Sequence, residues 1–135
     1  MQRTVRTFTG IIVAAMVVIG VLAVAHAQQP PVERRVLLQR DLTIPGHQAV
    51  LVAVTIQAGG REGRHTHPGT GLVHVLEGAL TLDHEARSRV TYKAGESFHV
   101  DAGIVHEGIN QGTTPVKALA TFIVEKGKPL TSQVP

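Results

Sequence analysis

The sequence predicts a single all-β domain, and three observations lead to that class. Its aliphatic runs are short and rich in β-branched residues. Turn residues interrupt these runs about every 8–12 residues, a spacing typical of a sandwich or small barrel. No stretch of residues 28–135 sustains the apolar period of 3.6 that marks an amphipathic helix.

The first expected strands end where proline and glycine occur. Val36–Leu38 opens the first run, which ends near Ile44–Gly46 because proline and glycine there favour a turn. Ala49–Gln57 is the most strongly β-branched segment, and Gly59–Gly60 closes it. We therefore expect these two runs to form the opening strands of the sheet.

The later expected strands are separated by further turn signals, among them Glu77–Gly78 and Ala94–Gly95. Leucine and polar residues alternate over residues 80–83, as expected for a strand with one buried face. The tail after Glu125 reads as an exit segment with a loose end. The strands expected here are Leu72–Leu76, Ala79–Leu82, Arg89–Tyr92, Ser97–Val100, Val105–Ile109 and Val116–Val124.

Composition excludes several classes of protein. The chain has 135 residues, of which 43% are apolar and 17% charged, and this excludes a disordered chain and a coiled coil. The absence of cysteine excludes a disulfide scaffold, a cysteine nucleophile and a thiolate metal site. Any metal must therefore be held by His, Asp or Glu.

The N-terminus has the pattern of a secretory signal peptide. Arg3 and Arg6 precede an apolar run in which 16 of the 20 residues Phe8–Ala27 are apolar, and the run closes with the small-residue pattern Ala25-His26-Ala27. We expect residues 1–27 to be removed and residues 28–135 to form one domain that is periplasmic or secreted. The alternative is a membrane anchor formed by residues 8–27.

The mature chain is nearly neutral. Without Arg3 and Arg6, Lys+Arg falls from 13 to 11 against 10 Asp+Glu, which leaves a net charge of +1. The basic residues are scattered, so we expect no nucleic-acid partner and, after cleavage, no membrane partner. A domain of this size buries little surface, which favours a homodimer.

Two histidines have the spacing of metal ligands. His65 and His67 stand at i and i+2, so on an extended strand both rings point to one face, about 6.5–7 Å apart. Imidazole nitrogens at that separation can converge on one ion, and His106 is the candidate third ligand. We expect the isolated His47 and His84 to be surface residues or satisfied polar groups.

Two sequence blocks resemble the conserved blocks of the cupin superfamily. The first is Gly59-x5-His65-x-His67-x3-Gly71-x6-Gly78, and the second is Gly95-x5-Asp101-x-Gly103-x2-His106-x3-Asn110. Sixteen residues separate the blocks, as in a small single-domain bacterial cupin. The resemblance implies a cupin-type jelly-roll barrel of two antiparallel sheets, and it makes His65, His67 and His106 metal ligands.

The sequence departs from the family pattern at two positions. Gly71 stands where the family usually has a glutamate ligand, and Asp101 stands where it usually has proline. A neutral three-histidine site favours Fe, Ni, Cu or Zn over Mg or Ca. Thiol and β-diketone dioxygenases of the superfamily work with three histidines, whereas relatives with manganese and oxalate-type chemistry use the glutamate.

Other residues can contribute to the site. Glu62, in the loop before His65, can reach the barrel mouth, whereas Glu77 and His74 are expected outside the pocket. His99 is a candidate general base if its face of the strand points inward. The apolar pocket lining is expected to be Val73, Val75, Phe98, Val100 and Phe122.

These features leave three hypotheses of function. The first is a metal-dependent oxygenase or isomerase acting on a small anionic or chelating metabolite. The second is a non-catalytic exported module that binds a metal or a small ligand. The third is a dimeric cupin with an empty site, which three imidazoles facing an apolar pocket argue against.

Overall fold

The structure is a computed structural model, and it describes residues 31–135. The predicted signal peptide, residues 1–27, lies outside the described residues. Within the described part, no helix is long and apolar enough to cross a bilayer.

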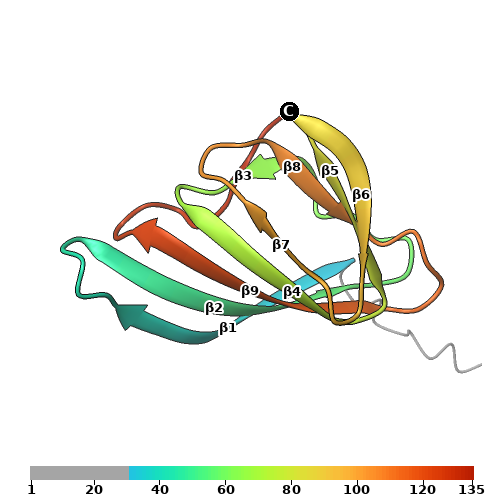
Figure 1. The fold of residues 1–135 in the computed structure, drawn as a ribbon, viewed down its shortest axis with the longest axis horizontal. Coiled ribbons are helices and arrows are strands. Elements are labelled where there is room, and N and C mark those ends of the chain that lie inside the picture. Colours follow the sequence, from blue (N-terminus) through green and yellow to red (C-terminus); the bar gives the residue numbers. More distant parts are fainter. Residues whose placement is uncertain (1–30) are drawn as a thin grey trace, which may run out of the picture.

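Ten strands build the described part of the chain, residues 31–135 (Figure 1). In chain order they are β1 (Val32–Asp41), β2 (His47–Ile56), β3 (His65–Thr66), β4 (Thr70–Glu77), β5 (Ala79–His84), β6 (Arg87–Lys93), β7 (Ser97–Val100), β8 (His106–Ile109), β9 (Val116–Glu125) and β10 (Ser132–Gln133). They form two five-stranded sheets, ordered β1-β2-β9-β4-β7 and β10-β3-β8-β5-β6. Every pairing between them is antiparallel, so the predicted all-β cupin-type fold is confirmed.

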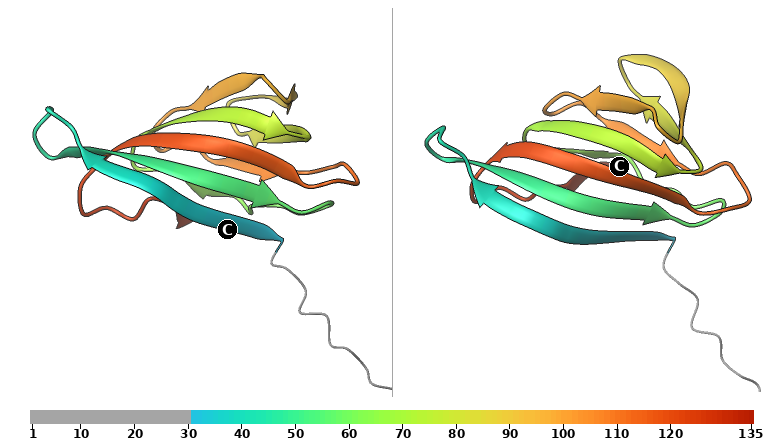
Figure 2. Two further views of the ribbon diagram at one scale, coloured as in Figure 1. Left: turned by 90° about the horizontal axis from the view of Figure 1, so that it is seen from below. Right: turned by 60° about the horizontal axis from the view of Figure 1, so that its bottom comes forward.

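The first sheet is built around the long strand β9. β9 lies between β2 and β4 although it comes last of the three in sequence, and Figure 2 shows these long strands side by side. Its residues alternate strictly between buried and more exposed positions, with Val116, Ala118, Ala120, Phe122 and Val124 buried. This period of two is what a strand with one face on the core requires.

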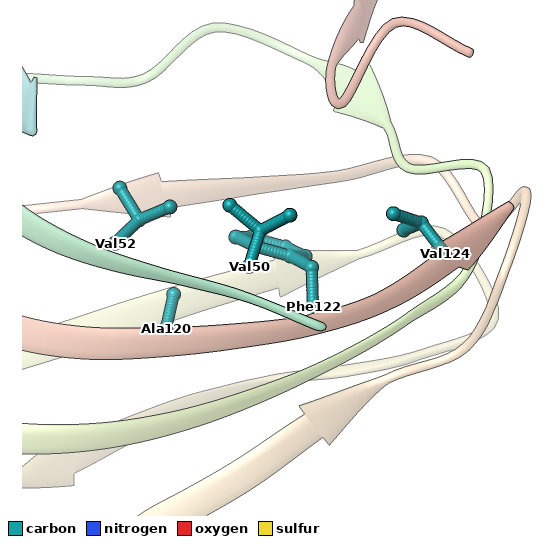
Figure 3. Packing of buried hydrophobic residues seen from close by; sticks show 5 residues of the cluster. All are labelled: Val50, Val52, Ala120, Phe122 and Val124. Carbon is teal, nitrogen blue, oxygen red and sulfur yellow. The ribbon is translucent and has the colours of Figure 1, made fainter. Parts of the chain in front are cut away.

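The core lies between the two sheets. One cluster consists of Val50 and Val52 from β2 with Ala120, Phe122 and Val124 from β9, and Figure 3 shows these side chains projecting to the same side. A second cluster joins Ile56, Val75, Leu80 and Val116 across both sheets. Burial of these aliphatic side chains, at about 25 cal/mol per Å² of apolar surface, is the main force that holds the sheets together.

Two expectations about the ends of the domain need correction. The first strand begins at Val32, four residues before the expected start, and ends at Asp41. The tail after Glu125 is not a loose end, because Ser132 and Gln133 of β10 pair with Thr66 and His65 of β3. A two-residue strand is too short to show a period of two, so hydrophobic patterning gave no sign of β10, and at β3 only the histidine spacing indicated extended backbone.

Candidate metal centre

Three histidine side chains converge inside the domain. His65 and His67 come from β3 and the residue just after it, and the pairing of β3 with β8 places His106 directly opposite His65. The ring centroids lie 4.9 Å apart for His65 and His67, 4.3 Å for His65 and His106, and 5.0 Å for His67 and His106. One ring nitrogen from each lies within 4.8 Å of the others.

Backbone carbonyls fix the orientation of all three rings. The Nδ1 atom of His65 lies 2.7 Å from the oxygen of Gly63, and that of His106 lies 2.9 Å from the oxygen of Ile104. The Nδ1 atom of His67 lies 2.7 Å from the oxygen of Leu130. Because a carbonyl oxygen only accepts, each Nδ1 carries a proton and donates it, which leaves the Nε2 lone pair free.

The three histidines are buried. Their exposed fractions are 2% for His65, 6% for His67 and 5% for His106. Burial lowers the pKa of His67 and of His106 to about 4, and hydrogen bonds to backbone carbonyls only partly offset this. A neutral imidazole with a free Nε2 is the form that binds a transition metal, so the donor set fits such an ion.

An apolar cavity of about 60 Å³ adjoins the three rings. Val73, Phe98, Val100 and Phe122 are among its lining residues, as are Gly71 and Glu62. Val75 is not, because this fully buried residue packs in the core behind Ile56, Leu80 and Val116.

His99 lies on the other face of the sheet from the cavity. Phe98 and Val100 point inward, and alternation along β7 therefore directs His99 outward, where its side chain is 52% exposed. Its Nε2 lies 4.0 Å from the carboxylate of Asp101. From this position His99 does not reach the cavity, and the structure gives it no role as a general base there.

The ring of Phe122 occupies the space beside Gly71. A Cβ atom on Gly71 would lie 3.0 Å from Cε1 and 3.3 Å from Cδ1 of Phe122. The same ring packs against His67, with centroids 4.4 Å apart. The position where the family usually has a glutamate therefore faces an apolar ring.

His84 differs from its expected place. It is 5% exposed, and its Nδ1 accepts a hydrogen bond from the backbone N–H of Ala86 at 3.1 Å. Its Nε2 has no hydrogen-bond partner within residues 31–135. The strand register places His84 opposite His106, on the same face as Leu80 and Leu82, and extending the alternation of residues 80–83 by one step would have found this.

Glu62 and Leu130 complete the surroundings of the three histidines. The carboxylate of Glu62 accepts hydrogen bonds from Nη2 of Arg34 at 2.9 Å and from the backbone N–H of Gly108 at 3.1 Å. Leu130, in the tail, lines the cavity and holds His67 through its carbonyl. Neither Arg34 nor Leu130 was predicted, because no local pattern shows that β1 or the tail reaches the cavity.

Comparisons with known proteins agree with the fold. Residues 52–128 match the family model described as Cupin domain. The chain is 34% identical over 87 residues to a germin-like protein, subfamily 2 member 2, of Arabidopsis thaliana, which covers 58% of this chain and 40% of that protein. The chain thus spans less than half the length of the curated relatives it matches.

Solved structures show the same architecture at low identity. A conserved protein with a double-stranded β-helix domain from Klebsiella pneumoniae has a TM-score of 0.65 and 18% identity, covering 82% of this chain and 90% of that one. A polyketide cyclase from Streptomyces resistomycificus has a TM-score of 0.61 and 20% identity, covering 78% and 72%. At such identities the likeness shows the fold alone.

Proposed function

The chain belongs to the cupin domain family, and from that premise we propose that it binds one divalent transition metal through His65, His67 and His106. Fe, Ni, Cu and Zn are the candidate ions, since the donors are three neutral nitrogens. When bound, the ion would supply Lewis-acid or oxygen chemistry to a small anionic or chelating ligand. We extend the proposal to an oxygenase or isomerase activity on such a ligand.

The strongest support for the metal site comes from the hydrogen bonds of the three histidines. Three Nδ1 atoms donate to three separate backbone carbonyls, so three Nε2 lone pairs are left for a shared partner. Without such a partner, three buried Nε2 atoms beside an apolar cavity would destabilise the fold, because each would lose its hydrogen bond to water. This pattern favours a working metal site over a fold kept only for its structure.

Metal analysis tests the proposal. Protein purified without chelator and loaded in turn with Fe(II), Ni(II), Cu(II) and Zn(II) is expected to retain about one ion per chain. His65→Ala should lose it, whereas His47→Ala should not, because His47 bonds to Pro45 at the start of β2, away from the cavity lining. Equal metal content in both variants, or no retention of any ion by the wild type, would overturn the metal site.

Oxygen consumption then separates the enzyme from the binding module. The Fe(II) protein is tested with thiols, diketones and catechols, which offer the metal chelating or anionic donors. Turnover lost in His65→Ala supports the oxygenase. A full complement of metal without turnover or isomerisation of any of these compounds supports the alternative, an exported module that only binds.

We also propose a homodimer formed through the outer face of the first sheet. Leu72 and Leu76 of β4 and Ile123 of β9 are 40–47% exposed there, with half-buried Leu51 and Leu119 on the same face. Exposed aliphatic side chains gathered on one face of a sheet are typical of protein interfaces, and such a face can pack on its own copy. Export is part of the same proposal, and mass spectrometry of the protein from its native host tests cleavage after Ala27.

A further inference from the structure

One guanidinium and one carboxylate line the cavity beside the three histidines and Thr131. Among the described residues that surround it, these are Arg34 and Glu62. Arg34 lies on the edge strand β1, opposite Val54 of β2, which also lines the cavity. The guanidinium therefore extends from the inner face of the first sheet, with 36% of its side chain exposed.

Glu62 holds the guanidinium beside the metal centre. Its side chain is only 14% exposed, and its carboxylate bridges Nη2 of Arg34 and the backbone N–H of Gly108. Gly108 follows His106 by two residues on β8, so both positions face the cavity. A Cβ atom at position 108 would collide with the Glu62 carboxylate, which shows how closely that carboxylate lies on the strand.

The ion pair with Glu62 uses only part of the Arg34 guanidinium. The bond to Glu62 engages Nη2, whereas a guanidinium carries five N–H donors in a planar fork. Arg34 can thus hold Glu62 and bind a second carboxylate at the same time.

We propose that Arg34 is the anion-recognition residue of this cavity, and that the ligand is a small dicarboxylate. This inference rests on the proposed metal site, which would bind one end of the ligand, while Arg34 binds the carboxylate at the other end. The cavity volume of about 60 Å³ holds roughly four to six water molecules. A dicarboxylate of three or four carbons has about that bulk.

Titration of the cobalt-loaded protein tests this assignment. The probes are malonate and succinate, which carry a second carboxylate, and acetylacetonate, which chelates a metal without one. The visible spectrum of cobalt reports binding, and metal content is measured in parallel. Arg34→Gln is expected to weaken the binding of the better dicarboxylate at least tenfold and to change acetylacetonate binding less than twofold.

Two further variants keep the test decisive. Arg35→Gln is the matched control, because the adjacent side chain is exposed on the opposite face of β1 and should leave all probes unchanged. The double variant Arg34→Gln with Glu62→Gln removes the carboxylate that the single variant would leave unpaired. It should show the same loss of dicarboxylate binding if the protein remains folded by circular dichroism.

The outcomes separate this inference from the proposed function. A wild type that retains neither cobalt nor any of Fe(II), Ni(II), Cu(II) and Zn(II) overturns the metal site, and with it the dicarboxylate that was to bridge metal and guanidinium. A wild type that retains cobalt but binds neither dicarboxylate overturns the inference alone. The inference also fails if Arg34→Gln and the double variant bind malonate and succinate as tightly as the wild type.

Discussion

The substitution Gly71→Glu tests whether position 71 faces the proposed metal ion. Changing it to glutamate restores the carboxylate that the cupin pattern usually has, on a strand position that lines the cavity. In this chain the new Cβ would meet the ring of Phe122 at 3.0 Å. The substitution therefore adds a metal ligand and a steric overlap at once.

The two effects have different sizes. Overpacking against Phe122 lowers the free energy of unfolding by about 1–3 kcal/mol. Replacing glycine also lowers the conformational entropy of the unfolded chain, which raises the free energy of unfolding by about 0.4–1 kcal/mol. Gly71→Glu alone should thus lower the free energy of unfolding by about 1–2 kcal/mol and Tm by roughly 5–10 °C. Combined with Phe122→Val, which clears the ring, the carboxylate should tighten metal binding about tenfold or more through its attraction for the divalent ion.

Competition with a coloured chelator measures the metal affinity of each variant. Gly71→Gln in the Phe122→Val background is the matched control, because it has the shape of glutamate without the charge. If the glutamate and glutamine variants hold the metal equally well, position 71 does not face the ion. The register of β4 against β9, which pairs Gly71 with Phe122, would then be wrong.

Three further predictions concern stability and assembly. His84→Leu should leave the free energy of unfolding unchanged or raise it by up to about 1 kcal/mol, because it removes a buried Nε2 without a partner; in urea denaturation, a loss above 2 kcal/mol would contradict this. Glu107 is buried and bonded to Arg61 at 2.9 and 2.5 Å, and the hydrogen bond from Arg61 lowers its pKa. Because this pKa is lower in the folded state than in the unfolded state, the ionised carboxylate stabilises the fold at neutral pH, and this stabilisation is lost as Glu107 becomes protonated. The Tm of the wild type should therefore fall below about pH 4–5, and the Tm of Glu107→Gln should fall less. Parallel profiles of Tm against pH for the two proteins would refute this prediction. Leu72→Lys should convert the proposed dimer to monomer in light scattering, whereas a dimer that persists would exclude that sheet face.

Local patterns predicted most of the strands. The alternation in residues 80–83 and the β-branched run over residues 49–57 correspond to β5 and β2, since burial of one face imposes a period of two. The start of β1 was missed because Glu33, Arg34 and Arg35 look solvated, yet an edge strand can carry charges. β10 was missed because two residues show no period, and at β3 only the spacing of His65 and His67 indicated extended backbone.

The histidine pair could be predicted because residues two apart in extended backbone share a face, and this holds here although β3 ends at Thr66, one residue before His67. The parts contributed by distant segments could not. Leu130 lies 63 positions from His67 and Arg34 lies 28 from Glu62, and only the closed tertiary fold brings them together. Likewise, no local signal indicates that Phe122 fills the space next to Gly71.

The place of the carboxylate determines the charge at the metal. A glutamate at position 71 would neutralise part of a divalent ion, but here the carboxylate in the cavity is Glu62, and Arg34 balances it. Three neutral imidazoles then leave two positive charges in an apolar cavity, which is costly unless an anion from solution joins them. Metal and anion should therefore strengthen each other's binding by the same factor, since linkage is reciprocal. Measuring cobalt affinity with and without saturating malonate, and malonate affinity with and without cobalt, tests this equality; a malonate affinity that is independent of the metal would show that the anion is not held by the pair of charges.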